Sequence, residues 1–182
     1  MKKFIAALLT AAALLPSLPA MAAPQAGSTQ PLPAAIKTGM PNPYIEYHTL
    51  AEMKNVLGFE PLSLPPAASY SCTTMYIIGD AVAELHFVGQ KDEAASSCII
   101  RSARIDIAGL EDISGYYQVQ WEDLHMSQTD LQVAQLDYDS YVARWTHGKY
   151  TFSFVGNTMS VDKYHQLLRL LVQRTEQKYN DR

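Results

Sequence analysis

The stretch "YVARWTHGKYTFSF", residues 141–154, decides the fold because large apolar and polar side chains alternate on both sides of a His-Gly pair. Alternation with a period of two predicts half-buried β-strands, and a Gly-containing pair between two such runs predicts a tight hairpin. With His147-Gly148 as the turn, three cross-strand pairs share one face: Trp145 with Tyr150, Ala143 with Phe152 and Tyr141 with Phe154. Because each aromatic side chain buries about 150 to 250 Å², this face is predicted to be the core.

The other strands are predicted on the N-terminal side of this hairpin. The segment "SCTTMYIIGDAVAELHFVG", residues 71–89, holds two β-prone runs around Gly79-Asp80, which favours a second hairpin. Further strands are expected over 97–107, 117–126 and 131–136. Together these segments predict an antiparallel meander of about five to seven strands.

Two helices flank the predicted sheet. In "YHTLAEMKNVLGF", residues 47–59, Thr49 and Glu52 form a capping box and Gly58 supplies a left-handed stop, so a short helix is expected between them. A longer C-terminal helix begins after Ser160 as N-cap. It carries one apolar stripe, made of Val161, Tyr164, Leu167, Leu168, Leu171 and Val172. The predicted fold class is α+β, with both helices packed on one face of the antiparallel meander.

The first 22 residues have the features of a secretory signal peptide. Lys2 and Lys3 precede an apolar run, and the pattern Ala20-Met21-Ala22 suits cleavage after Ala22. The run is too short for the roughly 20 residues that a membrane helix needs, so the mature form is expected to have no membrane span. We expect export to the periplasm or the extracellular space. The Pro- and Ala-rich residues 23–41 are predicted to be a flexible linker, and residues 42–182 a single domain.

The charge of the chain argues against nucleic acid and membrane-surface partners. The formal charge is 14 − 18 = −4, and it becomes 12 − 18 = −6 once the two lysines of residues 1–22 are removed. An acidic chain without a basic run repels phosphate backbones and anionic lipid headgroups. The length of the mature chain suits one independently folding domain, which we expect to be a monomer.

Cys72 and Cys98 are the only cysteines of the chain. Export to an oxidising compartment favours a disulfide between them, and free thiols are the alternative. The predicted sheet raises an objection. If Ile78 pairs with Ala81, Cys72 lies opposite Phe87, and a meander places Cys98 one strand further away. Two strand spacings are about 9.5 Å, beyond the reach of a disulfide, so either the bond or the predicted register is wrong.

The acid-rich segment "GLEDISGYYQVQWEDL", residues 109–124, is the strongest local candidate for a site. Its carboxylates could act as general acid and base only if a cleft held a pair of them with separated pKa values. Asp112 followed by Ser114-Gly115 instead favours a structural turn, in which side-chain oxygens accept from backbone N–H groups two residues on. Tyr116 and Tyr117 follow this turn and suit protein contact, so Asp112, Ser114, Tyr116 and Tyr117 form a possible interaction loop.

Other patterns associated with catalysis or metal binding are weak. Ser160 and Lys163 match the SxxK pattern of serine acylases, but the companion SDN and KTG motifs are absent and a helix cap explains Ser160 better. The five histidines do not form an HxxxH or HxH pair. Asp137 and Asp139 form a lone DxD, which supplies too few oxygen ligands for calcium. We therefore expect no cofactor, no metal and no catalytic residues.

Four segments in a fixed order resemble a family of uncharacterised bacterial extracytoplasmic domains. They are "NPYIEYHTLAEMKNVLGF" at 42–59, "DISGYY" at 112–117, "RWTHGKYTFSF" at 144–154 and "MSVDKYHQLLRLL" at 159–171. Members of that family follow signal peptides or lipoprotein anchors, and no catalytic residues are established for them, so the resemblance implies no active site. The chain departs from the family pattern by Cys72 and Cys98, by a longer segment before DISG, and by the lack of a cysteine for lipid attachment after the predicted cleavage site.

These observations favour an exported, non-enzymatic domain that binds a protein or an envelope component through an open sheet face or the DISG loop. Two alternatives remain. A small hydrophobic-ligand carrier requires an apolar cavity of at least about 300 Å³ between the sheet and the helices. A small serine hydrolase using Ser160 requires a nucleophile within about 3 Å of a base.

Overall fold

The computed structural model describes residues 43–179. The predicted signal peptide, residues 1–22, and the predicted linker, residues 23–41, lie outside the described residues. Within 43–179, no helix combines the length and the apolar character that crossing a membrane requires.

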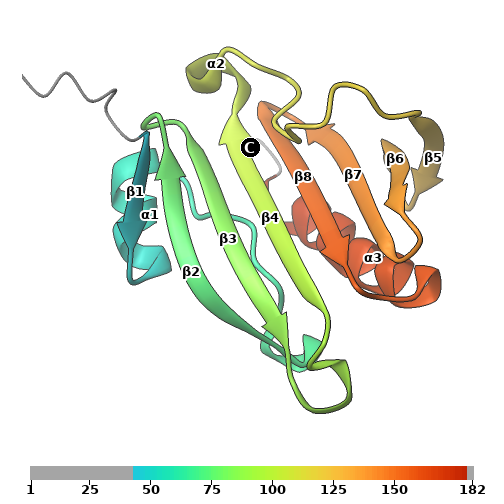
Figure 1. The fold of residues 1–182 in the computed structure, drawn as a ribbon. Helices are drawn as coiled ribbons and strands as arrows, with labels where there is room; N and C mark the ends of the chain where they lie inside the picture. Colours follow the sequence, from blue (N-terminus) through green and yellow to red (C-terminus); the bar gives the residue numbers. More distant parts are fainter. Residues whose placement is uncertain (1–42, 180–182) are drawn as a thin grey trace, which may run out of the picture. The chain divides into compact units, whose positions relative to one another are not determined.

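The described residues form an eight-stranded antiparallel sheet with three helices (Figure 1). The strands are β1 (Tyr44–Tyr47), β2 (Tyr70–Ile78), β3 (Val82–Gly89), β4 (Ser97–Arg104), β5 (Glu122–Met126), β6 (Thr129–Asp137), β7 (Ser140–His147) and β8 (Tyr150–Asn157). The helices are α1 (Leu50–Leu57), α2 (Ile105–Ala108) and α3 (Val161–Lys178), and two 3-10 turns are η1 (Pro66–Ala68) and η2 (Lys91–Glu93). The predicted α+β class is confirmed.

The sheet is two meanders joined side by side, which corrects the prediction of one continuous meander. The strand order is β1-β2-β3-β4-β8-β7-β6-β5, so β4 pairs with β8 in the middle of the sheet. Its register runs from Ser97 opposite Asn157 to Arg104 opposite Tyr150. After β4, the short helix α2 turns the chain away, and residues 105–121 cross the sheet to reach β5 (Figure 1). We call residues 105–121 the crossover segment.

The β7–β8 hairpin has its predicted core face but a different register. Gly148 and Lys149 form the turn, with Gly148 at φ +57°, and Trp145 lies opposite Phe152 where Tyr150 was predicted. Gly is favoured at this first turn position because it adopts positive φ without strain. The pairing is displaced by two residues, and an even displacement leaves every side chain on its predicted face.

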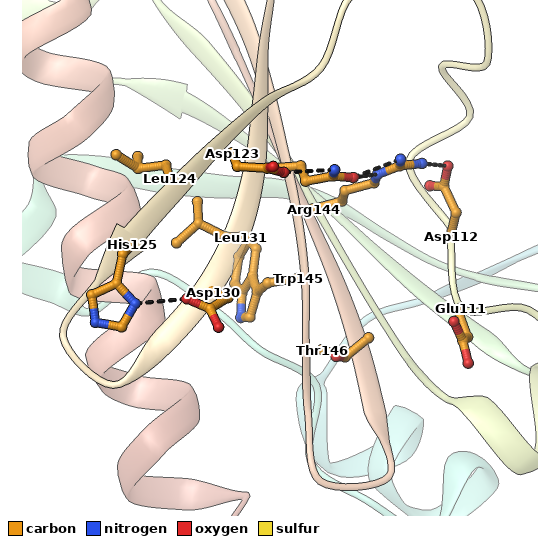
Figure 2. Close-up of a pocket in the computed structure, with 11 residues that line it drawn as sticks. Glu111, Asp112, Asp123, Leu124, His125, Asp130, Leu131, Arg144, Trp145 and Thr146 are labelled. Atoms are coloured by element: carbon orange, nitrogen blue, oxygen red, sulfur yellow. Dashed lines mark hydrogen bonds and ion pairs between the residues drawn. The ribbon is translucent and has the colours of Figure 1, made fainter.

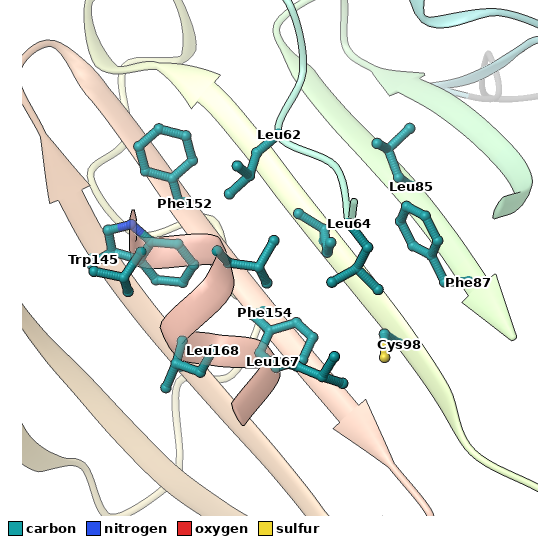
Figure 3. Close-up of a cluster of buried hydrophobic side chains, with 14 of the residues drawn as sticks. Leu62, Leu64, Leu85, Phe87, Cys98, Trp145, Phe152, Phe154, Leu167 and Leu168 are labelled. Carbon is teal, nitrogen blue, oxygen red and sulfur yellow. The ribbon is translucent and has the colours of Figure 1, made fainter. Parts of the chain in front are cut away.

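The face of the sheet that carries Phe152 and Phe154, here called the back face, holds the main core (Figure 3). Both side chains are fully buried, and Phe154 stacks on Tyr164 of α3 with ring centroids 4.9 Å apart. The same buried cluster contains Met53 of α1. It also contains five of the six residues of the predicted apolar stripe of α3: Tyr164, Leu167, Leu168, Leu171 and Val172. The burial of these apolar side chains stabilises the packing of α1 and α3 on the back face.

The predicted disulfide between Cys72 and Cys98 is not formed in the structure, in which both residues are free cysteines. Cys72 lies opposite Phe87 as predicted. The hairpin turn is one residue longer than expected, and a bulge between Cys72 and Thr74 compensates for the extra residue. Phe87 also lies opposite Cys98. Strand β3 therefore separates the two cysteines by two strand spacings, about 9.5 Å, which exceeds disulfide reach.

Candidate functional site

The opposite face of the sheet, here called the front face, carries a continuous row of mostly charged side chains. Consecutive cross-strand pairs connect the row from β3 to β5. Its members are Glu84, Arg101, Ser153, Arg144, Gln132 and Asp123, and we call them the polar row. Most of these side chains are partly or fully buried, so another segment of the chain covers this part of the sheet.

The cover is the crossover segment. Beneath it lies a small second cluster of buried residues, Ala134, Val142 and Val155. Tyr116, Val119 and Trp121 of the crossover segment pack against this cluster. This cluster holds far fewer buried residues than the back-face core, and polar contacts add to the attachment of the segment.

Arg101 attaches the DISG turn to β4. Its Nη1 donates to the carbonyl oxygens of Ile113 and Ser114, at 3.2 and 2.5 Å. Its Nε donates to Glu84 Oε2 at 2.6 Å, and Glu84 is only 4 % exposed. Glu84 also contacts His86 Nε2 at 2.6 Å. Charge-assisted hydrogen bonds of this kind are roughly twice as strong as neutral ones, and they fix the turn in position.

Arg144 attaches the same segment to β7. It donates to the carboxylate of Asp112, and its Nη2 donates to Gln132 Oε1 at 2.7 Å. The guanidinium also lies 4.2 Å from the centre of the Trp121 ring, a cation–π contact. Gln132 Nε2 then donates to Asp123 Oδ1 at 2.9 Å, so one chain of hydrogen bonds runs from Asp112 to Asp123 (Figure 2).

The DISG turn has the internal hydrogen bonds that the sequence predicts. The backbone N–H of Ser114 donates to Asp112 Oδ1 at 2.8 Å, and the N–H of Tyr116 donates to Ser114 Oγ at 3.2 Å. Gly115 adopts φ +79°, and a Cβ there would lie 2.9 Å from Arg101 Nη1. The fourth residue of the turn must therefore be small as well as tolerant of positive φ.

Asp112 is held in its charged form. Burial alone would raise its pKa, but hydrogen bonds from Ser114 and the nearby Arg144 guanidinium outweigh burial and hold the pKa below its ordinary value. A carboxyl that is ionised and bonded on both oxygens stabilises a structure better than it serves as a general acid.

The four predicted loop residues do not point the same way. Ser114 is completely buried and Asp112 partly buried, and both contact the sheet or the turn itself. Tyr116 is half-buried on the second cluster. Tyr117 is 77 % exposed and is the member of this set that faces solvent.

A groove of about 780 Å³ lies beside the crossover segment, over β5, β6 and β7 (Figure 2). The polar side chains that line it are Glu111, Asp112, Asp123, His125, Asp130, Gln132, Arg144 and Thr146. Four of them are carboxylates and one is a guanidinium, so the lining carries an excess of negative charge. His125 Nδ1 lies 2.7 Å from Asp130 Oδ1 at the rim.

The groove does not have the geometry of the active sites considered above. The side chains of His125 and Asp130 are 67 % and 94 % exposed, so water solvates this pair. Ser160 Oγ accepts from the backbone N–H of Lys163 as a helix cap, and Lys163 Nζ pairs with Glu93 at 2.9 Å. Ser160 therefore caps a helix and Lys163 forms an ion pair, so the two residues do not form a nucleophile and base. Among residues 43–179, no group of three or more His, Cys, Asp or Glu side chains is placed to hold a metal ion.

Sequence reasoning did not single out the two arginines that organise this site. The alternation of side chains in 97–107 and 141–154 does place Arg101 and Arg144 on the face opposite the core, and that signal could have identified them as candidates. Their partners in the crossover segment depend on the β4–β8 pairing, which no local pattern specifies.

Comparisons with known proteins add no further assignment. No protein-family model matches the chain, and searches of curated proteins and of solved structures found no significant match.

Proposed function

We propose that this protein is an exported, non-enzymatic binding module whose groove beside the crossover segment takes a basic segment of an envelope protein. The observation that carries the proposal is the lining of the groove, where carboxylates outnumber guanidinium groups four to one. Opposite potentials across an interface steer association and select the partner, so an acidic groove favours a partner rich in Lys and Arg.

The groove is also preorganised. One wall is the crossover segment, which Arg101 and Arg144 attach to the sheet, and the floor is formed by paired strands. Rigid walls reduce the entropy that binding would otherwise lose. At the rim, the exposed side chain of Asp130 and the exposed residues Glu111 and Asp123 remain accessible to a ligand.

Charge-reversal variants test the groove directly. The double variant Asp123→Lys/Asp130→Lys changes the net charge by +4, and Glu46→Lys/Asp162→Lys makes the same change at exposed positions outside the groove lining. Binding of a fluorescent hexalysine peptide is measured by anisotropy at several salt concentrations. We expect the groove variant to weaken binding about tenfold or more, equivalent to about 1.4 kcal/mol, and the control variant to weaken it much less.

Equal losses in the two variants would contradict the proposal, because they would show attraction by net charge alone. The native partner is identified with a photo-crosslinking residue at Thr146, in the groove, in intact cells. Crosslinks to a basic stretch of an envelope protein support the proposal, and crosslinks confined to a glycan or lipid would overturn it.

The proposal also includes export and a monomeric state. Both rest on the sequence, through residues 1–22 and the length of the remaining chain. Cell fractionation tests export, and light scattering of the mature protein tests the monomeric state.

A further inference from the structure

A second pocket, of about 260 Å³, lies on the back face over β2 and β3, towards the opposite end of the strand order from the groove over β5, β6 and β7. Strands β2 and β3, helix α1 and the Pro-rich loop after α1 form its walls. The lining residues are Leu50, Ser63, Leu64, Pro66, Tyr70, Cys72, Met75, Leu85 and Phe87. Figure 3 shows three of them, Leu64, Leu85 and Phe87, among the back-face side chains.

The pocket has a buried floor and a partly exposed rim. Leu64, Leu85 and Phe87 are 7 %, 1 % and 5 % exposed, whereas Leu50 and Met75 are only partly buried. A small molecule could therefore enter from solvent past the rim and reach an apolar interior.

Two of the polar groups in the lining are already bonded to the protein. Tyr70 Oη shares a hydrogen bond of 2.7 Å with Ser96 Oγ, and Cys72 Sγ donates to the carbonyl oxygen of Thr74 at 3.7 Å. Six of the nine lining residues are apolar, and water in contact with them is displaced favourably by apolar surface. Filling this space with an apolar ligand is therefore more favourable than filling it with water.

We propose that this pocket is a binding site for a small apolar molecule, with the Cys72 side chain in its wall. The volume is below the roughly 300 Å³ that a carrier of larger hydrophobic ligands requires, so only a small ligand fits. An engineered apolar cavity of about 150 Å³ in another protein holds benzene, so 260 Å³ accommodates about ten non-hydrogen atoms. The ligand class is a substituted benzene ring or a short aliphatic chain. This site is independent of the acidic groove, since the two linings share no residue.

Cys72 provides a chemical reporter of occupancy. Burial raises the pKa of its thiol, although less than it raises the pKa of Cys98, which reaches about 12. Cys98 is only 1 % exposed, so an alkylating reagent reaches Cys72 first. A ligand in the pocket would cover the Cys72 sulfur and slow its alkylation.

Benzene is the probe for the test, and the full mature domain is the protein. Methyl NMR is expected to show saturable shifts at Leu64, Met75 and Leu85, with Val142 and Val155 of the front face unchanged. Alkylation of Cys72 by iodoacetamide is expected to slow about twofold when the benzene concentration equals the Kd from NMR, because only unoccupied protein reacts. The variant Cys72→Leu fills the pocket and should abolish the shifts. Thr74→Leu, on the front side of the same strand, should retain them.

Shifts that do not saturate, that occur equally at Val142 and Val155, or that leave the alkylation rate unchanged would overturn the proposal. Should Cys72→Leu fail to fold, alkylation of the wild-type protein decides the question alone.

Discussion

The two faces of one sheet are held in different ways. On β7 and β8, alternate residues belong to opposite faces: Trp145 and Phe154 enter the large apolar core, whereas Arg144 and Ser153 belong to the polar row. Apolar burial is roughly proportional to area and has no preferred direction. The front face depends instead on a small number of hydrogen bonds to charged groups, and these bonds have a preferred direction. The back face therefore sets stability, and the front face sets the position of the crossover segment and with it the shape of the groove.

The largest expected effect is on the back face. Phe154→Ala removes a fully buried ring that stacks on Tyr164, and we expect a loss of about 3 to 5 kcal/mol in the free energy of unfolding. Urea denaturation followed by circular dichroism measures it. A loss below about 1 kcal/mol would show that this face is not the main core.

The next effect concerns the front face and comes from charge. Arg101→Met leaves Glu84 buried without its guanidinium partner, and we expect a loss of about 3 kcal/mol. The double variant Arg101→Met/Glu84→Met removes both partners and should be more stable than the single variant. Denaturation of the four proteins of this cycle gives the coupling free energy. Additive losses would mean that Arg101 and Glu84 do not depend on each other.

A smaller effect appears on acidification. The pKa of Asp112 is lower in the folded protein than in the unfolded chain, so its contribution is complete above about pH 4 and is lost as the pH falls through the folded-state pKa. Asp112→Asn removes this contribution. Between about pH 5 and pH 2.5, we expect the variant to lose less stability than the wild type. Parallel denaturation curves across this range would contradict the account.

The smallest effect is expected at Tyr117. Its side chain is 77 % exposed, so Tyr117→Ala should change the free energy of unfolding by less than about 0.5 kcal/mol. The matched change Tyr116→Ala, at a half-buried position on the second cluster, should be clearly larger. Similar values for the two neighbours, measured by thermal denaturation, would mean that the crossover segment does not pack as described.

Local patterns in the sequence predict most of what local forces determine. The alternation in 141–154 identifies the core face, and the hydrogen bonds of Ser114 and Tyr116 follow from the residue types of the DISG turn. The cap at Ser160 is likewise local, since its Oγ accepts from the N–H three residues on. Side-chain periodicity and turn chemistry act over a few residues, so no knowledge of the rest of the fold is needed.

Long-range pairing explains what the sequence does not predict. Ser97 and Asn157 are 60 residues apart, and their pairing in the β4–β8 register makes the polar row continuous. The disulfide was predicted from the expected oxidising compartment and from the presence of two cysteines, but the strand order separates Cys72 from Cys98. Strand β1 was not predicted either; three of its four residues are exposed, and its place in the sheet depends on its pairing with β2.

Amide hydrogen exchange at Ser114 and Tyr116 tests the central claim most directly. Their N–H groups donate to Asp112 Oδ1 and Ser114 Oγ in a turn that Arg101 and Arg144 attach to the sheet. The account predicts slow exchange at both amides in the wild type and fast exchange in Arg101→Met, with the amides of Leu167 and Leu168 still protected. Exchange at the rate of an unstructured peptide in the wild type would contradict it, because the acid-rich segment would then be a free loop.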